Sequence, residues 1–151
     1  MLTTLKSLLL DVWRVYLTLL KVMVPALIIV KVLDMIGGTQ WLGKLLAPLM
    51  NVVGLPEEMG LVWATAMLTN IYTGMAVFFD LAGDNPLTVA QVSVLGVMML
   101  LAHALPVEGA VAKLSGISWR VTLLLRIGGG FILGMLANQV YLLGNWQQQP
   151  A

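Results

Sequence analysis

Hydrophobic residues occupy long stretches of the chain, and polar residues interrupt these stretches at only a few places. Two stretches, 60–79 and 87–107, contain no formally charged side chain. Because a membrane-spanning helix needs about 20 predominantly apolar residues, each stretch is long enough to cross a bilayer. A further apolar helix is expected from about Trp119 to Leu143, with no charged side chain after Arg126.

The first part of the chain combines apolar residues at helical spacing with interleaved charges. This pattern predicts an amphipathic helix over 1–21 that lies at the membrane interface or enters the membrane from it. The helix is expected to continue to Asp34 with a kink at Pro25, because proline removes a helical hydrogen bond. The apolar positions are Leu5, Leu8, Leu9, Val12, Trp13, Tyr16, Leu19 and Leu20, and the charged ones are Lys6, Asp11, Arg14 and Lys21.

A short amphipathic segment over 40–53 follows and is too short to span a bilayer comfortably. It can cross, lie flat on the membrane, or dip in and return, and the sequence leaves this choice open. We therefore divide the chain into an N-terminal amphipathic helix at 1–21, a transmembrane domain at 22–143 and a polar tail at 144–151.

Composition sets the class of protein. Hydrophobic residues make up 60% of the chain and charged residues 10%, with a mean hydropathy of +0.95, whereas soluble domains carry roughly 25% charged residues. The predicted fold is an all-α integral membrane protein with about four to five hydrophobic helices, including broken or re-entrant segments. The chain has no cysteine, which excludes disulfides and thiolate metal sites.

Polar and helix-disrupting residues interrupt the first uncharged stretch near its middle. Thr69, Asn70, Tyr72 and Thr73 are the candidate ligands for a substrate or ion there, and Gly74 is the candidate helix break. Unwinding would present backbone carbonyls and side-chain oxygens at membrane depth, as transporters do for small polar solutes and coupling cations. Alternatively, the threonines and the asparagine hydrogen-bond this helix to a neighbour, while glycine permits close approach.

The second uncharged stretch is interrupted by His103 and Pro106, with Glu108 just beyond. Pro106 is the candidate helix break, and Glu108 places a carboxylate close to His103. Because ionisable residues inside a membrane mark functional sites by default, this pair could move protons or neutralise a cation. In the alternative interpretation, Glu108 lies near the interface and pairs with Lys113.

Several classes of chemistry are not expected. His103 and Glu108 supply neither a metal shell nor a nucleophile with its base, so we expect no catalytic site, metal site or cofactor, and no enzyme. The run Gly128-Gly129-Gly130 with Gly134 lacks the strand and lysine of a phosphate loop and indicates tight helix packing instead. No nucleic-acid partner is expected.

Lysine and arginine do not select an orientation if the helices near 22, 60 and 90 each cross once. One side then collects Lys6, Arg14 and Lys21, and the other collects Lys44, Lys113 and Arg120. A chain without bias could insert both ways and pair with an inverted copy of itself.

The order of segments resembles a known family. The residues that carry the resemblance are Pro25, Ala47-Pro48-Leu49-Met50, Gly54-Leu55-Pro56, Leu87-Thr88-Val89 and Pro106. Over residues 20–116 this pattern is similar to the bacterial Gate, or nucleoside-recognition, domain. The same domain occurs in spore maturation proteins A and B, in the ferrous-iron transporter and in concentrative nucleoside transporters.

The resemblance implies a multi-pass protein of the bacterial inner membrane, in contact with membrane lipid, that helps to move a small solute such as a nucleoside or an ion. It implies coupling to H⁺ or Na⁺ and work as a homo-oligomer or with a second Gate-domain chain. Two functions stay open: a solute translocator in which Asn70, Thr73, His103 and Glu108 face a central cavity, or a membrane scaffold or accessory subunit in which they lock helices together.

Overall fold

The computed structural model describes residues 2–83 and 86–151, so Met1, the first residue of the predicted N-terminal helix, lies outside it. Three helices are long and apolar enough to cross a membrane, Leu8–Leu33, Val89–Leu114 and Trp119–Gly144, and two shorter apolar helices accompany them. The predicted all-α integral membrane fold is confirmed. The elements are α1 (Leu2–Met35), α2 (Gly38–Val52), α3 (Met59–Leu68), α4 (Ile71–Ala82), α5 (Val89–Leu101), α6 (Leu105–Leu114), α7 (Trp119–Leu123), the π-helix η1 (Leu124–Gly128) and α8 (Gly129–Gly144).

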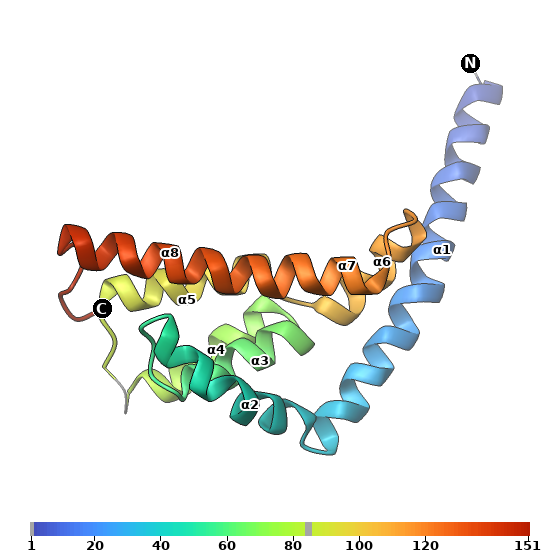
Figure 1. The fold of residues 1–151 in the computed structure, drawn as a ribbon. Coiled ribbons are helices and arrows are strands. Elements are labelled where there is room, and N and C mark those ends of the chain that lie inside the picture. The colour runs from blue at the N-terminus through green and yellow to red at the C-terminus, as the bar shows by residue number, and fades with distance from the viewer. Residues whose placement is uncertain (1, 84–85) are drawn as a thin grey trace.

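The body of the protein is a bundle in which most helices run along one direction. α7, η1 and α8 form one long rod that lies beside α5 (Figure 1). α3 and α4 also pack on α5, and α2 packs on α3. α3 and α4 make a hairpin whose turn lies at Thr69 and Asn70. Each arm of this hairpin is shorter than a membrane crossing, so the hairpin has the length of a re-entrant segment.

Glycines let the long helices approach closely. A Cβ added at Gly134 would lie 2.6 Å from Met98 Cγ, and one at Gly130 would lie 3.3 Å from the carbonyl oxygen of Met98. Gly130 and Gly134 are therefore the α8 positions that allow contact with α5, as the packing interpretation of this glycine-rich run predicts. Gly128 and Gly129 face open space instead.

Apolar side chains of α2, α3 and α5 form the core. Trp63 and Met98 are completely buried, and the Trp63 indole Nε1 donates a hydrogen bond to the carbonyl oxygen of Met98 at 3.2 Å. A buried indole N–H needs such a partner, because an unsatisfied donor in an apolar core is costly. The core thus ties the hairpin arm α3 to the long helix α5.

We predict that Gly60→Ala destabilises the protein. The new Cβ would lie 2.8 Å from the Gly43 carbonyl oxygen and 3.0 Å from the Ala47 nitrogen. Backbone atoms cannot move aside as a flexible side chain can, so α2 must separate from α3 at a cost of about 1–3 kcal/mol. Thermal unfolding in detergent measures the effect.

The matched control for Gly60→Ala is Gly96→Ala, where nothing lies within 4 Å of the added Cβ. Replacing a helical glycine in open space should leave the unfolding midpoint unchanged or raise it, because alanine has the better helix propensity. Equal midpoints for the two variants would contradict the close packing of α2 on α3.

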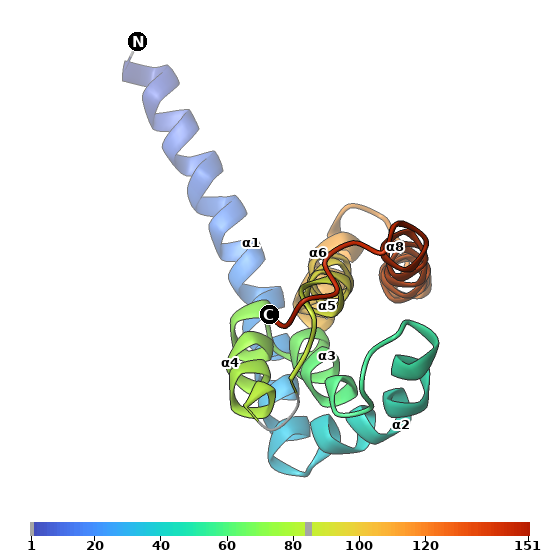
Figure 2. The same ribbon diagram turned by 90° about the vertical axis from the view of Figure 1, so that its left-hand side faces the viewer.

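α1 is one continuous helix that passes through Pro25, as the sequence predicts. It ends before Gly37, whose left-handed φ of 82° suits glycine and turns the chain into α2. Val22, Ala26 and Ile29 of α1 line a cavity of about 240 Å³ together with residues of α6 and α7. Nearer its N-terminus, α1 projects away from the bundle (Figures 1 and 2), with residues 8–18 exposed.

Candidate functional site

The first break separates α3 from α4 at Thr69 and Asn70. Asn70 has an extended backbone, and its side-chain oxygen accepts a hydrogen bond from the Thr73 N–H at 3.0 Å. Asparagine is a favoured residue for this N-cap role, which starts α4 in its new direction. The Thr69 hydroxyl donates to the carbonyl oxygen of Thr65 at 2.7 Å, so it closes the end of α3.

The second break separates α5 from α6 at residues 102–104. Ala104 adopts a left-handed conformation with φ 46° and ψ 35°. A residue with a Cβ pays about 1–2 kcal/mol for that conformation, so the surrounding contacts must stabilise it. Pro106 follows as the second residue of α6.

Both residues predicted to break the helices lie just after the breaks. Gly74 is inside α4, where an added Cβ would lie 2.7 Å from Ala66 Cβ and 2.9 Å from Met99 Cε, so its role is close approach. Pro106 lies in the first turn of α6, where its missing N–H costs nothing. The helical conformation is lost earlier, at Thr69 in the first break and at Ala102 in the second.

The two breaks touch each other. The Ala104 N–H donates a hydrogen bond of 2.9 Å to the carbonyl oxygen of Ala66. In an unbroken α3 helix this oxygen would accept from residue 70, four positions on. The hairpin tip and the broken helix therefore each provide a backbone partner that the other lacks.

The side chains of His103 and Arg126 cover the carbonyls that the second break leaves open. His103 Nδ1 lies 3.0 Å from the carbonyl oxygen of Met99 and 3.1 Å from that of Leu100. Arg126 Nη1 donates to the carbonyl oxygen of Leu101 at 3.1 Å. These oxygens are at the C-terminus of α5, where the helix dipole favours positive charge.

Glu108 joins these two side chains from the other half of the broken helix. Its Oε1 lies 3.4 Å from His103 Nε2, and its Oε2 forms an ion pair with Arg126 Nη1. Glu108 lies in the first turn of α6, where the helix dipole favours negative charge. The C-terminus of α5 therefore lies beside a positive charge and the N-terminus of α6 carries a negative one, which stabilises both helices. The Glu108 carboxylate links these two helix ends.

This charged cluster, His103, Glu108 and Arg126, lies within the apolar spans. Val89–Leu114 has 26 residues, and His103 falls close to its middle. The side chains of His103 and Glu108 are each 27% exposed and that of Arg126 is 34% exposed. Both ring nitrogens of His103 face oxygen acceptors, and only the protonated ring donates to both sides. Glu108 thus has two basic partners at once, the His103 imidazole at one oxygen and the Arg126 guanidinium at the other.

The structure brings together only some of the predicted site residues. His103 and Glu108 meet, as expected, and Glu108 is paired with Arg126 instead of Lys113, which is exposed. The first break contributes exposed side chains: Tyr72 is 79% exposed, and Asn70 and Thr73 are exposed as well. They lie at the tip of the α3–α4 hairpin and in the first turn of α4. In the part of the single chain that the structure describes, they do not form one enclosed site with the charged cluster.

Arg126 was absent from the predicted site, although one signal marks it. It lies inside the apolar span Trp119–Gly144, two turns beyond Arg120 at the start of that span, and a charge at that depth requires a partner. It also lies in η1, a single π-helical turn, and such turns are frequent at functional sites. The sequence alone gives neither the π-helical turn nor the partner, because Glu108 lies on another helix.

The fold and this site define a helical integral membrane protein in which a hairpin tip meets a broken span. The Gate family, described as nucleoside recognition, matches residues 16–118, and the chain belongs to this family. The predicted resemblance is confirmed.

An uncharacterized membrane protein of Bacillus subtilis (strain 168), YvoD, is 32% identical to this chain over 124 residues. That alignment covers 82% of this chain and 38% of the Bacillus protein, so the chain spans about two fifths of its relative's length. No solved structure matches.

Proposed function

We propose that this protein takes part in moving a small solute, a nucleoside-like compound or an ion, across the bacterial inner membrane as a multi-pass oligomer. The observation that carries the proposal is the meeting of the two helix breaks, Ala104 on Ala66, beside the charged cluster. Broken helices that meet at membrane depth are the way transporters build solute sites, because unwound backbone is tolerated only where it is buried or lines a water-filled path.

The charged cluster supports coupling to H⁺ or Na⁺. The Arg126 guanidinium is paired with the Glu108 carboxylate in this structure. A proton or a cation that binds the carboxylate therefore has to displace the guanidinium. Displacement also frees Arg126 from the carbonyl oxygen of Leu101, which loosens the connection between α5 and α6. Binding of the ion and movement of the half-helices would then be linked, as alternating access requires.

The exposed face of α4 supports an oligomer. Ile71, Met75, Phe79, Gly96 and Leu100 contribute to an apolar groove of about 350 Å³ between α4 and α5. The polar residues Asn70, Tyr72 and Thr73 lie exposed beside this face, and a second chain would enclose them. A homo-oligomer or a second Gate-domain chain would then complete the polar part of the solute path.

A scaffold or accessory subunit is the second candidate. The observation that favours it is that each charge of the cluster has a partner within the same chain: Arg126 and His103 both contact Glu108 and carbonyls of α5. Such a network can lock two half-helices together without binding a solute. Under this candidate function, the transported solute is handled by a partner protein.

A thermal-stability screen of the purified oligomer tests the proposed function. The panel contains adenosine, uridine, inosine, the free nucleobases, small organic ions and sodium chloride, each at several pH values. A ligand at 100 times its Kd stabilises the folded state by about 2.7 kcal/mol, so a binding compound should raise the midpoint reproducibly. Gln148→Ala, in the exposed C-terminal tail, is the control and should respond like the unmodified protein. A folded oligomer that responds to no compound would favour the scaffold.

A further inference from the structure

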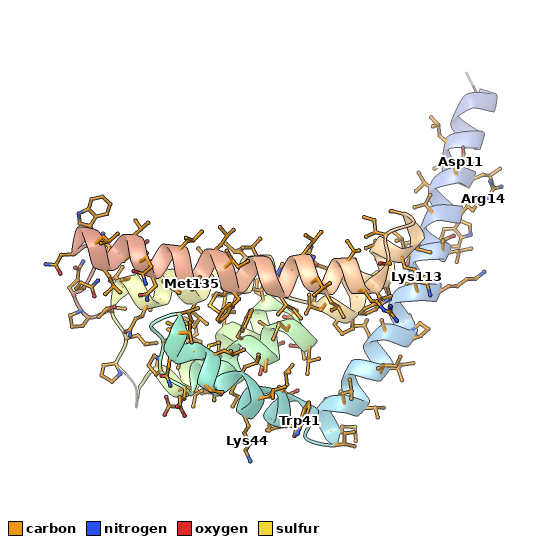
Figure 3. The ribbon with its side chains drawn as sticks, in the orientation of Figure 1. Asp11, Arg14, Trp41, Lys44, Lys113 and Met135 are labelled. Atoms are coloured by element: carbon orange, nitrogen blue, oxygen red, sulfur yellow. The ribbon has the colours of Figure 1, made fainter. Side chains whose placement is uncertain are left out.

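A groove between α2 and the start of α3 carries charges of both signs. Its volume is about 370 Å³, and its charged residues are Lys44, Glu57 and Glu58. Lys44 projects from α2 on the side away from α8 (Figure 3), and all three residues are exposed. Among the described residues, none of these three side chains forms an ion pair. The groove therefore offers an ammonium group and two carboxylates to a ligand.

Two glycines fix the position of Lys44 relative to α3. A Cβ added at Gly60 would lie 2.8 Å from the Gly43 carbonyl oxygen, and one added at Gly43 would lie 2.9 Å from Leu61 Cα. α2 and α3 are therefore in backbone contact at the base of the groove, directly beside Lys44. The distance between the cation and the two carboxylates is set by this packing and not by a flexible loop.

The carboxylates lie at the level where the apolar core of the membrane ends. Gln91 Nε2 donates a hydrogen bond of 2.9 Å to the carbonyl oxygen of Gly54. Gln91 is close to the start of the span Val89–Leu114, and the end of a span meets the headgroup region. The turn that begins at Gly54 leads directly to Glu57 and Glu58, so this turn brings both carboxylates to headgroup level.

Lys44 begins deeper in the membrane than the carboxylates. The Gly60 N–H donates to the carbonyl oxygen of Glu57 at 3.0 Å, so Gly60 lies one turn farther along α3. α3 runs inward from there to its contact with the second break, and Gly43, beside Lys44, touches Gly60. A lysine at this depth extends its ammonium group toward the headgroups. Going inward from the surface, the groove thus presents negative charge first and positive charge second.

We propose that this groove binds the headgroup of an aminophospholipid of the phosphatidylethanolamine type. In such a lipid the phosphate is attached to the glycerol and lies on the inner side, while the amine lies on the outer side. The phosphate would then pair with Lys44 and the amine with Glu57 and Glu58, while Ala47 and Leu61, which also line the groove, contact the apolar part of the lipid. The inference needs only the membrane and does not depend on solute transport.

A primary amine suits these carboxylates better than the quaternary amine of phosphatidylcholine. A primary ammonium group has three N–H donors, whereas a quaternary one has none. Charge-assisted hydrogen bonds to carboxylates are about twice as strong as neutral ones. Asn51 Nδ2 already donates to Glu57 Oε1 at 2.9 Å, which orients that carboxylate. The groove should therefore select phosphatidylethanolamine over phosphatidylcholine, although both lipids carry the same two charges.

A series of lipids tests the selection. The unfolding midpoint of the purified oligomer is measured in nanodiscs of phosphatidylcholine alone, and in nanodiscs that also contain phosphatidylethanolamine or its mono- or dimethylated form. Binding to the folded state raises the midpoint, so we expect the highest midpoint with phosphatidylethanolamine and a decrease with each methyl group. Phosphatidylglycerol, which has the phosphate but no amine, should raise the midpoint less than phosphatidylethanolamine does.

Charge variants show whether the effect comes from the groove, because phosphatidylethanolamine also changes the bilayer as a whole. Lys44→Gln and Glu58→Gln should each lose most of the difference between phosphatidylethanolamine and phosphatidylcholine. Asp80→Asn and Lys113→Gln are the matched controls, since both residues are exposed and lie outside the groove, and they should retain the difference. Each variant is compared with itself in the two lipids, so its own loss of stability does not affect the result.

Three results would overturn the proposal. Equal midpoints of the natural chain in the two lipids would show that the groove does not select the amine. Equal losses in the groove variants and the controls would assign the effect to the bilayer or to net charge. The third result uses soluble phosphoethanolamine, added to phosphatidylcholine nanodiscs. If it raises the midpoint as much as the lipid does, the groove binds a soluble zwitterion and not a lipid.

Discussion

Glu108→Gln is expected to abolish solute movement while the protein still assembles. Glutamine keeps the shape of the side chain but cannot neutralise Arg126 or accept a proton at neutral pH. Removing one partner of a buried ion pair costs about 3–5 kcal/mol, and the partial exposure of Glu108 and Arg126 reduces this to about 2 kcal/mol of lost unfolding free energy. Uptake into proteoliposomes of the compound found in the stability screen measures activity, and gel filtration measures assembly.

The double variant Glu108→Gln/Arg126→Gln separates stability from transport. It removes both charges together, so no unpaired cation remains, and most of the lost unfolding free energy should return. Transport should stay absent, because the exchangeable carboxylate is gone. If the double variant transports as well as the natural chain, the carboxylate has no part in coupling. If the single variant dissociates the oligomer instead of stopping uptake, the scaffold function is the better one.

Ala104→Val is the second substitution with a large expected effect. Ala104 is held at φ 46°, and a β-branched residue is a strong outlier in that region. We expect a loss of about 2 kcal/mol or more of unfolding free energy, because the break must change conformation or bear the strain. Loss of the hydrogen bond from Ala104 to Ala66 should impair uptake together with stability, and thermal unfolding with proteoliposome uptake measures both.

Ala104→Asn is the control, since asparagine is also larger than alanine but tolerates the left-handed conformation. It should be clearly less destabilising than valine. Ala104→Gly should raise the unfolding midpoint, because glycine adopts this conformation without a steric penalty. Equal losses for valine and asparagine would mean that side-chain volume, and not backbone conformation, limits this position.

The sequence predicts the fold class and both breaks because these depend on local properties. Long uncharged stretches require helices in a membrane, and Asn70 and His103 are unfavourable at the centre of such helices. The pairing of Glu108 is different in kind. Lys113 is its neighbour along the same helix, whereas Arg126 reaches it from the antiparallel rod α7–η1–α8. The packing of α5 against α8 brings Glu108 and Arg126 together. The residue pattern along a single helix gives no information about that packing.

The positions of Gly74 and Pro106 show a second limit. Both residues are associated with broken helices, but their actual roles are close packing and helix initiation. Sequence indicates that unwinding is near, while the exact residue depends on which backbone group finds a partner. Ala104 unwinds because its N–H reaches Ala66, and alanine itself carries no local signal for a left-handed conformation. The crosswise position of α1 is also invisible to hydropathy, which measures composition and not direction.

The hydrogen bond between Ala104 and Ala66 gives the protein a natural reporter of its own state. The Ala104 amide proton is protected from exchange with water only while the hairpin tip rests on the broken helix. Its exchange rate in deuterated buffer therefore reports how often the tip lifts away. A single amide signal could follow this opening in a lipid environment without any label attached to the chain.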